Sequence, residues 1–208
     1  VKDNNSELRA LAYHLYENNG VVKRDTVLSY LNKLNQDERK KLRNLGVKFG
    51  RYHVFLFKLF KPSSVSLRIL LWKSFNEKDL NLFPPTFGLN FMEEKEKINR
   101  DFMLLCGFEK FDKFFVRIDI LERLFILIFN SNKENNNEIK LIPEMLNLLG
   151  CSKENFIRLL KSMGYKTFKK DKDIYFKYLS NKKKFTKKTK QINKIDNPFG
   201  ILSQLNLK

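Results

Sequence analysis

The chain has 208 residues, 42% of them hydrophobic, with 20 phenylalanines and a net charge of +18. This composition is typical of a globular protein and excludes a disordered one, while no apolar run approaches the roughly 20 residues that span a bilayer. The opening residues, VKDNNSELRA, lack the apolar segment of a secretory signal, so we expect a cytoplasmic location. Strong basicity favours nucleic-acid binding, but lysine and asparagine also accumulate in proteins from AT-rich genomes. The position of the charge is therefore more informative than its sum.

Residues 1–61 predict three helices followed by a hairpin. An apolar stripe in SELRALAYHLYENN predicts a helix that stops at Gly20, and a second helix is expected after it. Asn35 with Glu38 predicts a capping box for a third helix, which ends at Gly46. The aromatic-rich stretch 47–57 then predicts a hairpin.

Residues 62–100 predict a linking helix and an irregular connector. Pro62 begins the helix PSSVSLRILLWKSF, whose apolar side chains need a groove to bury them. We interpret Trp72 as a packing anchor in this helix. Pro84 and Pro85 exclude helix from the segment that follows.

Residues 101–179 predict a second unit of helices and a hairpin. Asp119 with Glu122 reads as a capping box at the start of its first helix. Pro143 begins a short second helix, which ends at Gly150. A third helix and a hairpin follow.

The third helix begins after Ser152 and ends in a repeat of the first half of the chain. LRNLGVK at 42–48 and LKSMGYK at 160–166 correspond position by position, and both lead into a predicted hairpin. The order of elements also repeats. We therefore predict a mainly α fold with small β hairpins (α+β), built from two winged-helix-like three-helix units and followed by a basic tail, 180–208.

The candidate nucleic-acid contacts are basic and polar residues of the second unit and the tail. In a winged helix-turn-helix the outer face of the second helix of the motif lies against a duplex. On that face and on the hairpin stand Lys153, Asn155, Arg158, Lys161, Lys166, Lys169, Lys170 and Lys172, and the tail adds Lys182, Lys183, Lys184, Lys187 and Lys188. The corresponding face in the first unit, with Arg39, Lys40 and Arg43, is open to a partner or to water. An apolar plug, Phe199 to Leu205, is a candidate protein contact.

No catalytic or metal-binding pattern is present in the sequence. Two cysteines, Cys106 and Cys151, and two histidines, His14 and His53, are too few and too scattered for a metal site. We interpret the cysteines as structural thiols and the histidines as surface or packing residues. There is no glycine-rich loop ending in GK[ST] and no DExH box, so the chain has no cradle for ATP or Mg²⁺.

Several segments resemble one family in collinear order. LGVKFGRYHVFLFKLFKPSSVSLRILLW resembles the LGVRFG…YHVF…LLKP…LW segment of alphaproteobacterial superfamily II ATP-dependent helicases (DEAD/DEAH-type). These helicases are related to the RNA helicase of the mitochondrial degradosome. VRIDILERL, IPEMLNLLGCSKENFIRLLKSMGY and NPFGILSQL resemble later parts of the same C-terminal region. The resemblance implies a piece of a longer helicase, whose upstream core binds ATP and Mg²⁺.

We therefore expect a non-catalytic accessory region that binds the RNA or DNA backbone beside a helicase motor. Two alternatives remain open. One is a protein-interaction module that docks a nuclease or a ribosomal partner. The other is a free-standing winged-helix DNA-binding protein. The sequence leaves open whether the whole protein is an enzyme, and it predicts no membrane partner.

Overall fold

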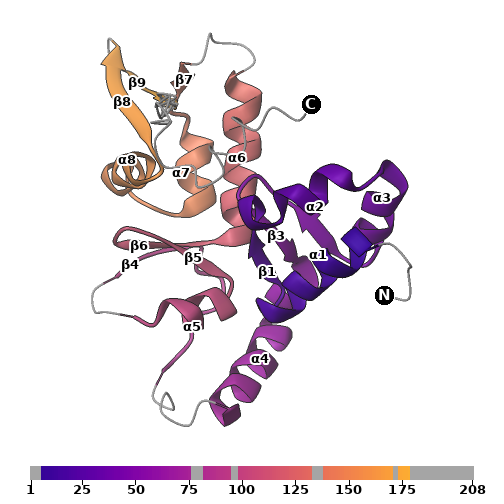
Figure 1. The fold of residues 1–208 in the computed structure, drawn as a ribbon. Helices are drawn as coiled ribbons and strands as arrows, with labels where there is room; N and C mark the ends of the chain where they lie inside the picture. The colour runs from indigo at the N-terminus through magenta and orange to yellow at the C-terminus, as the bar shows by residue number, and fades with distance from the viewer. Residues whose placement is uncertain (1–5, 76–81, 95–97, 133–137, 171–172, 179–208) are drawn as a thin grey trace, which may run out of the picture.

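The computed structural model describes residues 6–75, 82–94, 98–132, 138–170 and 173–178. These residues form a mixed α and β protein, which confirms the predicted α+β class. Their strands make three antiparallel sheets of three strands each, and every sheet has its own helices (Figure 1). We call the three parts the first unit (6–61), the middle unit (62–117) and the third unit (118–178).

The first unit contains the predicted helices and hairpin, and one strand that the sequence did not indicate. Its elements are α1 Ser6–Glu17, β1 Val21–Lys23, η1 Arg24–Val27, α2 Leu28–Lys33, α3 Gln36–Asn44, β2 Val47–Phe49, β3 His53–Leu56 and η2 Phe57–Phe60. The capping box at α3 is confirmed, because Asn35 Oδ1 accepts from the Glu38 amide at 2.9 Å and the Asn35 amide donates to Glu38 Oε2 at 2.8 Å. The unpredicted strand, β1, pairs with β3.

The middle unit occupies the segment for which the sequence predicted a linker. Its elements are α4 Pro62–Phe75, β4 Phe91–Glu93, α5 Arg100–Leu105, β5 Phe108–Phe111 and β6 Phe114–Arg117. The helix α4 was predicted, but β4 pairs with β6, placing Phe91 opposite Val116. The predicted division at residue 100 therefore passes through one sheet. A three-residue strand after two prolines carries no periodic pattern, which is why the sequence did not indicate it.

The third unit follows the middle unit without a connecting residue. Its elements are α6 Ile118–Asn132, β7 Ile139–Lys140, α7 Pro143–Leu149, α8 Lys153–Ser162, β8 Tyr165–Lys170 and β9 Asp173–Tyr178. The prediction of a capping box from Asp119 and Glu122 is wrong, because α6 already begins at Ile118. Asp119 instead accepts from the Arg117 side chain at 2.7 Å and from the Ile120 amide at 3.0 Å. The Glu122 carboxylate contacts the first unit.

All three units share one order of elements and one sheet order. Each has a helix, a strand, further helix and a hairpin, and the last hairpin strand lies in the middle of its sheet: β1-β3-β2, β4-β6-β5 and β7-β9-β8. A glycine stands at the same place in each, directly after the last helix and before the hairpin. Gly46, Gly107 and Gly164 have φ of +98°, +89° and +86°, a conformation that favours glycine. The repeat seen at 42–48 and 160–166 is thus threefold.

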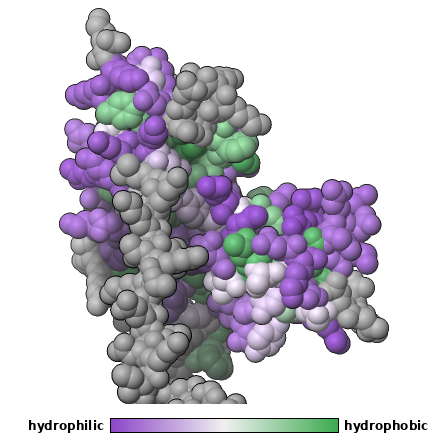
Figure 2. Space-filling view, turned by 45° about the horizontal axis from the view of Figure 1, so that its top comes forward, coloured by the Kyte–Doolittle hydropathy of each residue, from purple (hydrophilic) through white to green (hydrophobic). Residues whose placement is uncertain are grey.

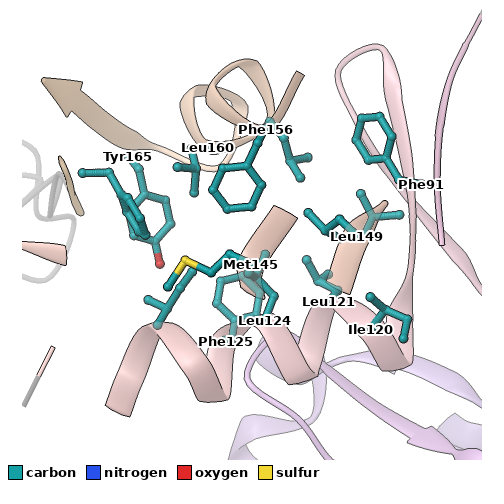
Figure 3. Packing of buried hydrophobic residues seen from close by; sticks show 14 of the residues in the cluster. Phe91, Ile120, Leu121, Leu124, Phe125, Met145, Leu149, Phe156, Leu160 and Tyr165 are labelled. Atoms are coloured by element: carbon teal, nitrogen blue, oxygen red, sulfur yellow. The ribbon is translucent and has the colours of Figure 1, made fainter. Parts of the chain in front are cut away.

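The units pack on each other through a shared apolar interior. On α6, Leu121, Leu124 and Phe125 are buried against the third unit's own helices and sheet, and the same cluster includes Phe91 of β4 (Figure 3). A smaller cluster joins β3 to the start of α6 through Phe55 and Ile118. These contacts bury side chains of all three units and so fix how the units are placed relative to one another.

Candidate nucleic-acid interface

Helix α8 presents basic side chains on one face because its other face is anchored in the core. Ser152 caps the helix, with its Oγ accepting from the Asn155 amide at 3.2 Å, as predicted. The inner face carries three buried apolar residues, Phe156, Leu159 and Leu160. The remaining face exposes Lys153, Arg158 and Lys161 to solvent. Asn155 lies half-buried at the edge of this face.

Of the three predicted lysine contacts on β8, two are exposed and form no ion pair with described residues, and the third is held in an ion pair. Lys166 and Lys169 are exposed on β8. Lys170 forms an ion pair with Glu138, and its ammonium lies 5.7 Å from the ring centroid of Tyr175. This pairing keeps Lys170 on the sheet, so its charge is partly neutralised.

The remaining predicted contacts lie outside the described residues. They are Lys172, the tail residues Lys182, Lys183, Lys184, Lys187 and Lys188, and the apolar plug from Phe199 to Leu205.

Five of the predicted contacts in the third unit therefore have charges that the described part of the chain leaves unpaired. They are Lys153, Arg158, Lys161, Lys166 and Lys169, none of which forms a salt bridge there. Two neighbouring acids are already engaged, since Glu138 pairs with Lys170 and Asp173 pairs with Lys140. Hydrophilic side chains cover most of the described surface in Figure 2, with small hydrophobic patches between them. The five cations are held on a helix and a hairpin that the core orients.

A buried ionic cluster holds the first unit against the other two. His53 on β3 is 2% exposed, and its Nε2 lies 2.9 Å from Glu109 Oε2 on β5. Glu109 also accepts from the Arg100 guanidinium at 2.7 Å. From α6, the Glu122 carboxylate accepts from the backbone amides of Arg51, Tyr52 and His53 and caps the first unit's hairpin turn.

The cluster shifts the ionisation of its members. Burial alone would lower the pKa of His53, but the hydrogen bond to Glu109 and the nearby carboxylate of Glu122, 3.8 Å from His53 Nδ1, outweigh it and raise that pKa above 6.5. Burial opposes the charge of Glu109 too, yet hydrogen bonds from His53 and Arg100 lower its pKa to about 2. His53 is a packing residue, one of the two interpretations that the sequence allowed. Its partners are missed by sequence reasoning because they lie 56 and 69 residues away.

Helix α4 exposes apolar side chains that no other described element covers. Only its Val65 and Ile69 are buried, whereas Leu70 is 66% and Phe75 is 90% exposed. Trp72 packs on Phe102 with ring centroids 5.4 Å apart, as expected of an anchor. Beside the helix lies a hollow of about 250 Å³, whose lining includes three prolines and four phenylalanines. This surface has the chemistry of a protein contact and not of a polyanion site.

Comparisons of the chain with protein-family profiles, with curated proteins and with solved structures give no match. Within the described residues, no group of three or more histidine, cysteine, aspartate or glutamate side chains could hold a metal ion. A search of the same residues finds no helix of the length and apolarity that a membrane span requires.

Proposed function

We propose that this chain is a tandem array of three winged-helix units that binds the nucleic-acid backbone through its third unit. In this proposal it acts as the non-catalytic C-terminal accessory region of an ATP-dependent helicase. The observation that carries it is the set of five exposed cations on α8 and β8, the two elements that a winged helix lays against a duplex. The element order and the strand order of each unit support the winged-helix assignment, and the collinear resemblance supports the helicase assignment.

The contacts are of a kind that binds phosphate without reading sequence. Four of the five cations are lysines, whose ammonium groups act as point charges on phosphate oxygens, whereas base readout relies on planar donors aimed at base edges, of which Arg158 is the one in this set. Five such contacts predict a slope of log affinity against log salt of about −4.5 on duplex and about −3.5 on single strands. Affinity is expected to depend weakly on sequence.

The test is fluorescence anisotropy with single-stranded RNA, single-stranded DNA and duplex, each titrated with salt. The variant Arg158→Glu with Lys161→Glu removes the centre of the α8 face. Its matched control, Arg9→Glu with Lys113→Glu, makes the same change of charge on exposed residues of α1 and of the β5–β6 turn. We expect at least a tenfold loss for the α8 variant and a far smaller loss for the control.

Equal losses in the two variants would mean that net charge alone drives binding, and the third-unit site would then be wrong. A chain that ends after Leu179 separates the contribution of the tail, because it keeps every described residue. If binding disappears with the tail while the α8 variant binds normally, the winged-helix surface is not the site. We also expect no ATP hydrolysis by the chain alone, and hydrolysis would contradict the accessory role.

A second candidate function, docking of another protein, is favoured by the exposed apolar face of α4. Its partner would present an apolar surface, since the exposed positions Leu67, Leu70, Leu71 and Phe75 carry no charge. If this face is open in solution, the dye anilinonaphthalene sulfonate should bind the protein, and Leu70→Glu with Phe75→Glu should abolish that binding. An unchanged dye signal in the variant would refute this candidate, and light scattering distinguishes a second copy of the chain from a different partner.

A further inference from the structure

The first unit repeats three basic positions of the third unit. The positive-φ glycine before each hairpin gives a common reference, and the residues six before, three before and two after it can be compared. These positions hold Lys40, Arg43 and Lys48 in the first unit, and Arg158, Lys161 and Lys166 in the third. All six side chains are exposed.

The three cations of the first unit lie exposed on α3 and β2, and we call this region of the unit the α3–β2 surface. The Arg43 guanidinium lies 5.7 Å from the ring centroid of Phe49, which holds it over the sheet. Lys40 and Lys48 form no salt bridge with described residues. The acids of α3 lie in its first turn, where Glu38 is engaged in the capping box. The surface therefore carries its positive charge toward the hairpin, as in the third unit.

The middle unit shows that the fold does not require basic residues at these positions. Counted from Gly107, the same three positions hold Asp101, Leu104 and Glu109. Glu109 is buried and bound to His53 and Arg100, so it serves packing between units. The first and third units thus share basic residues at these positions, and the middle unit, which has the same topology, lacks them.

We propose that α3 and β2 form a second surface for the phosphate backbone of nucleic acid, and that the two surfaces hold two separate stretches of it. This inference rests on the proposed function of the third unit. In Figure 1, α3 and α8 lie at opposite edges of the molecule with α6 between them. The buried clusters that join the units keep the two surfaces apart.

The position of the two surfaces at opposite edges of the molecule (Figure 1) favours occupation by two short duplexes over one. A straight duplex of one helical turn, about 34 Å long, can lie on one surface without bending around the molecule to the other. Each surface then takes its own duplex. The chain would act as a bridge between two strands or two segments.

The experiment measures bridging by the full chain between two ten-base-pair duplexes, one labelled with a donor dye and one with an acceptor. Wild type is expected to bind two duplexes, counted by native mass spectrometry, and to give energy transfer between them. The variant Lys40→Glu with Arg43→Glu and the variant Arg158→Glu with Lys161→Glu should each bind one duplex fewer and lose the energy transfer. The control Arg9→Glu with Lys113→Glu should behave as wild type, and circular dichroism verifies that every variant is folded.

The outcomes separate this inference from the function on which it rests. If the α8 variant loses a duplex while the α3 variant still bridges two, the second surface is refuted and the third-unit site stands. If neither variant changes the count of duplexes, both proposals fail. If wild type binds two duplexes but gives no energy transfer, the two surfaces do not act at once and bridging is refuted.

Discussion

Replacing Glu109 with glutamine removes the charge that holds His53 between the units. Glu109 is 5% exposed and contacts both His53 and Arg100. Burial would raise its pKa, but the hydrogen bonds from these two partners lower it from 4.5 to about 2. A fall of that size corresponds to about 3 kcal/mol of folding free energy at neutral pH. We expect a loss of about 2 kcal/mol, because the Arg100 side chain is 49% exposed and water screens part of its charge.

The contribution of the same cluster to the free energy of unfolding depends on pH in two ranges, one acidic and one near neutral. The pKa of Glu109 is lowered from 4.5, so its contribution to stability is present above pH 4.5 and is lost as the pH falls toward about 2. The pKa of His53 is raised from 6.5, so its contribution is complete below pH 6.5 and is lost as the pH rises through the raised value. The cluster therefore stabilises the protein most between pH 4.5 and 6.5. In the variant Glu109→Gln, the free energy of unfolding should depend less on pH both below and above this window.

The assay is urea unfolding followed by far-ultraviolet circular dichroism, inside this pH window and well above it. Glu7→Gln serves as the control, because Glu7 pairs with Lys33 on the surface and should have little effect on the free energy of unfolding. His53→Gln and the double variant complete a cycle whose non-additivity measures the coupling between His53 and Glu109. Wild-type stability of Glu109→Gln inside the window, or simple addition of the losses of the two single variants, would refute the stabilising contact between Glu109 and His53.

Four further predictions each concern one residue. Gly164→Ala should cost about 1 kcal/mol from backbone strain at positive φ, since its new Cβ would have nothing nearer than 3.8 Å. Gly107→Ala should cost more in the same urea assay, because its Cβ would also meet the Phe60 ring at 3.2 Å, and equal costs would contradict this packing. Phe156→Ala should lose about 3–5 kcal/mol, since the ring is fully buried, and a loss under about 1 kcal/mol would place it outside the core. Burial raises the pKa of Cys106 to about 12, so alkylation by iodoacetamide at neutral pH should be much slower than for a free thiol, as mass spectrometry can test.

Local signals in the sequence were enough to predict the ends of α3 and α8. Asn35 with Glu38, and Ser152 before α8, form the caps that the sequence predicts, because a cap involves residues only three apart. The glycines that end α3 and α8 were predicted for the same reason, since a left-handed turn is a property of one residue. The exposure of Arg158 and Lys161 follows from helix periodicity, so this part of the candidate site was within reach of the sequence.

Local signals could not indicate the short strands or the hydrogen-bond partners that lie far away in the sequence. Strands β1, β4 and β7 have two or three residues each and carry no alternation that could be recognised. Without β4, the middle unit looked like a connector and the threefold repeat looked twofold. Asp119 and Glu122 have the spacing of a capping box. The Glu122 carboxylate instead accepts hydrogen bonds from backbone amides of the first unit. Packing between the units brings these donors to the carboxylate, and the local sequence cannot indicate them.

The sequence by itself determined where the charged residues fall and where helices such as α3 and α8 begin and end, because both depend on residues close together in the chain. Only the tertiary structure decided which charged side chains stay exposed to solvent and which are paired or buried. Lys170 is held by Glu138 from 32 residues away and Glu109 is buried against His53, whereas Lys40 and Lys48 remain exposed. Pairing and burial are set by long-range packing, and that packing also places α3 and α8 on opposite edges of one body (Figure 1).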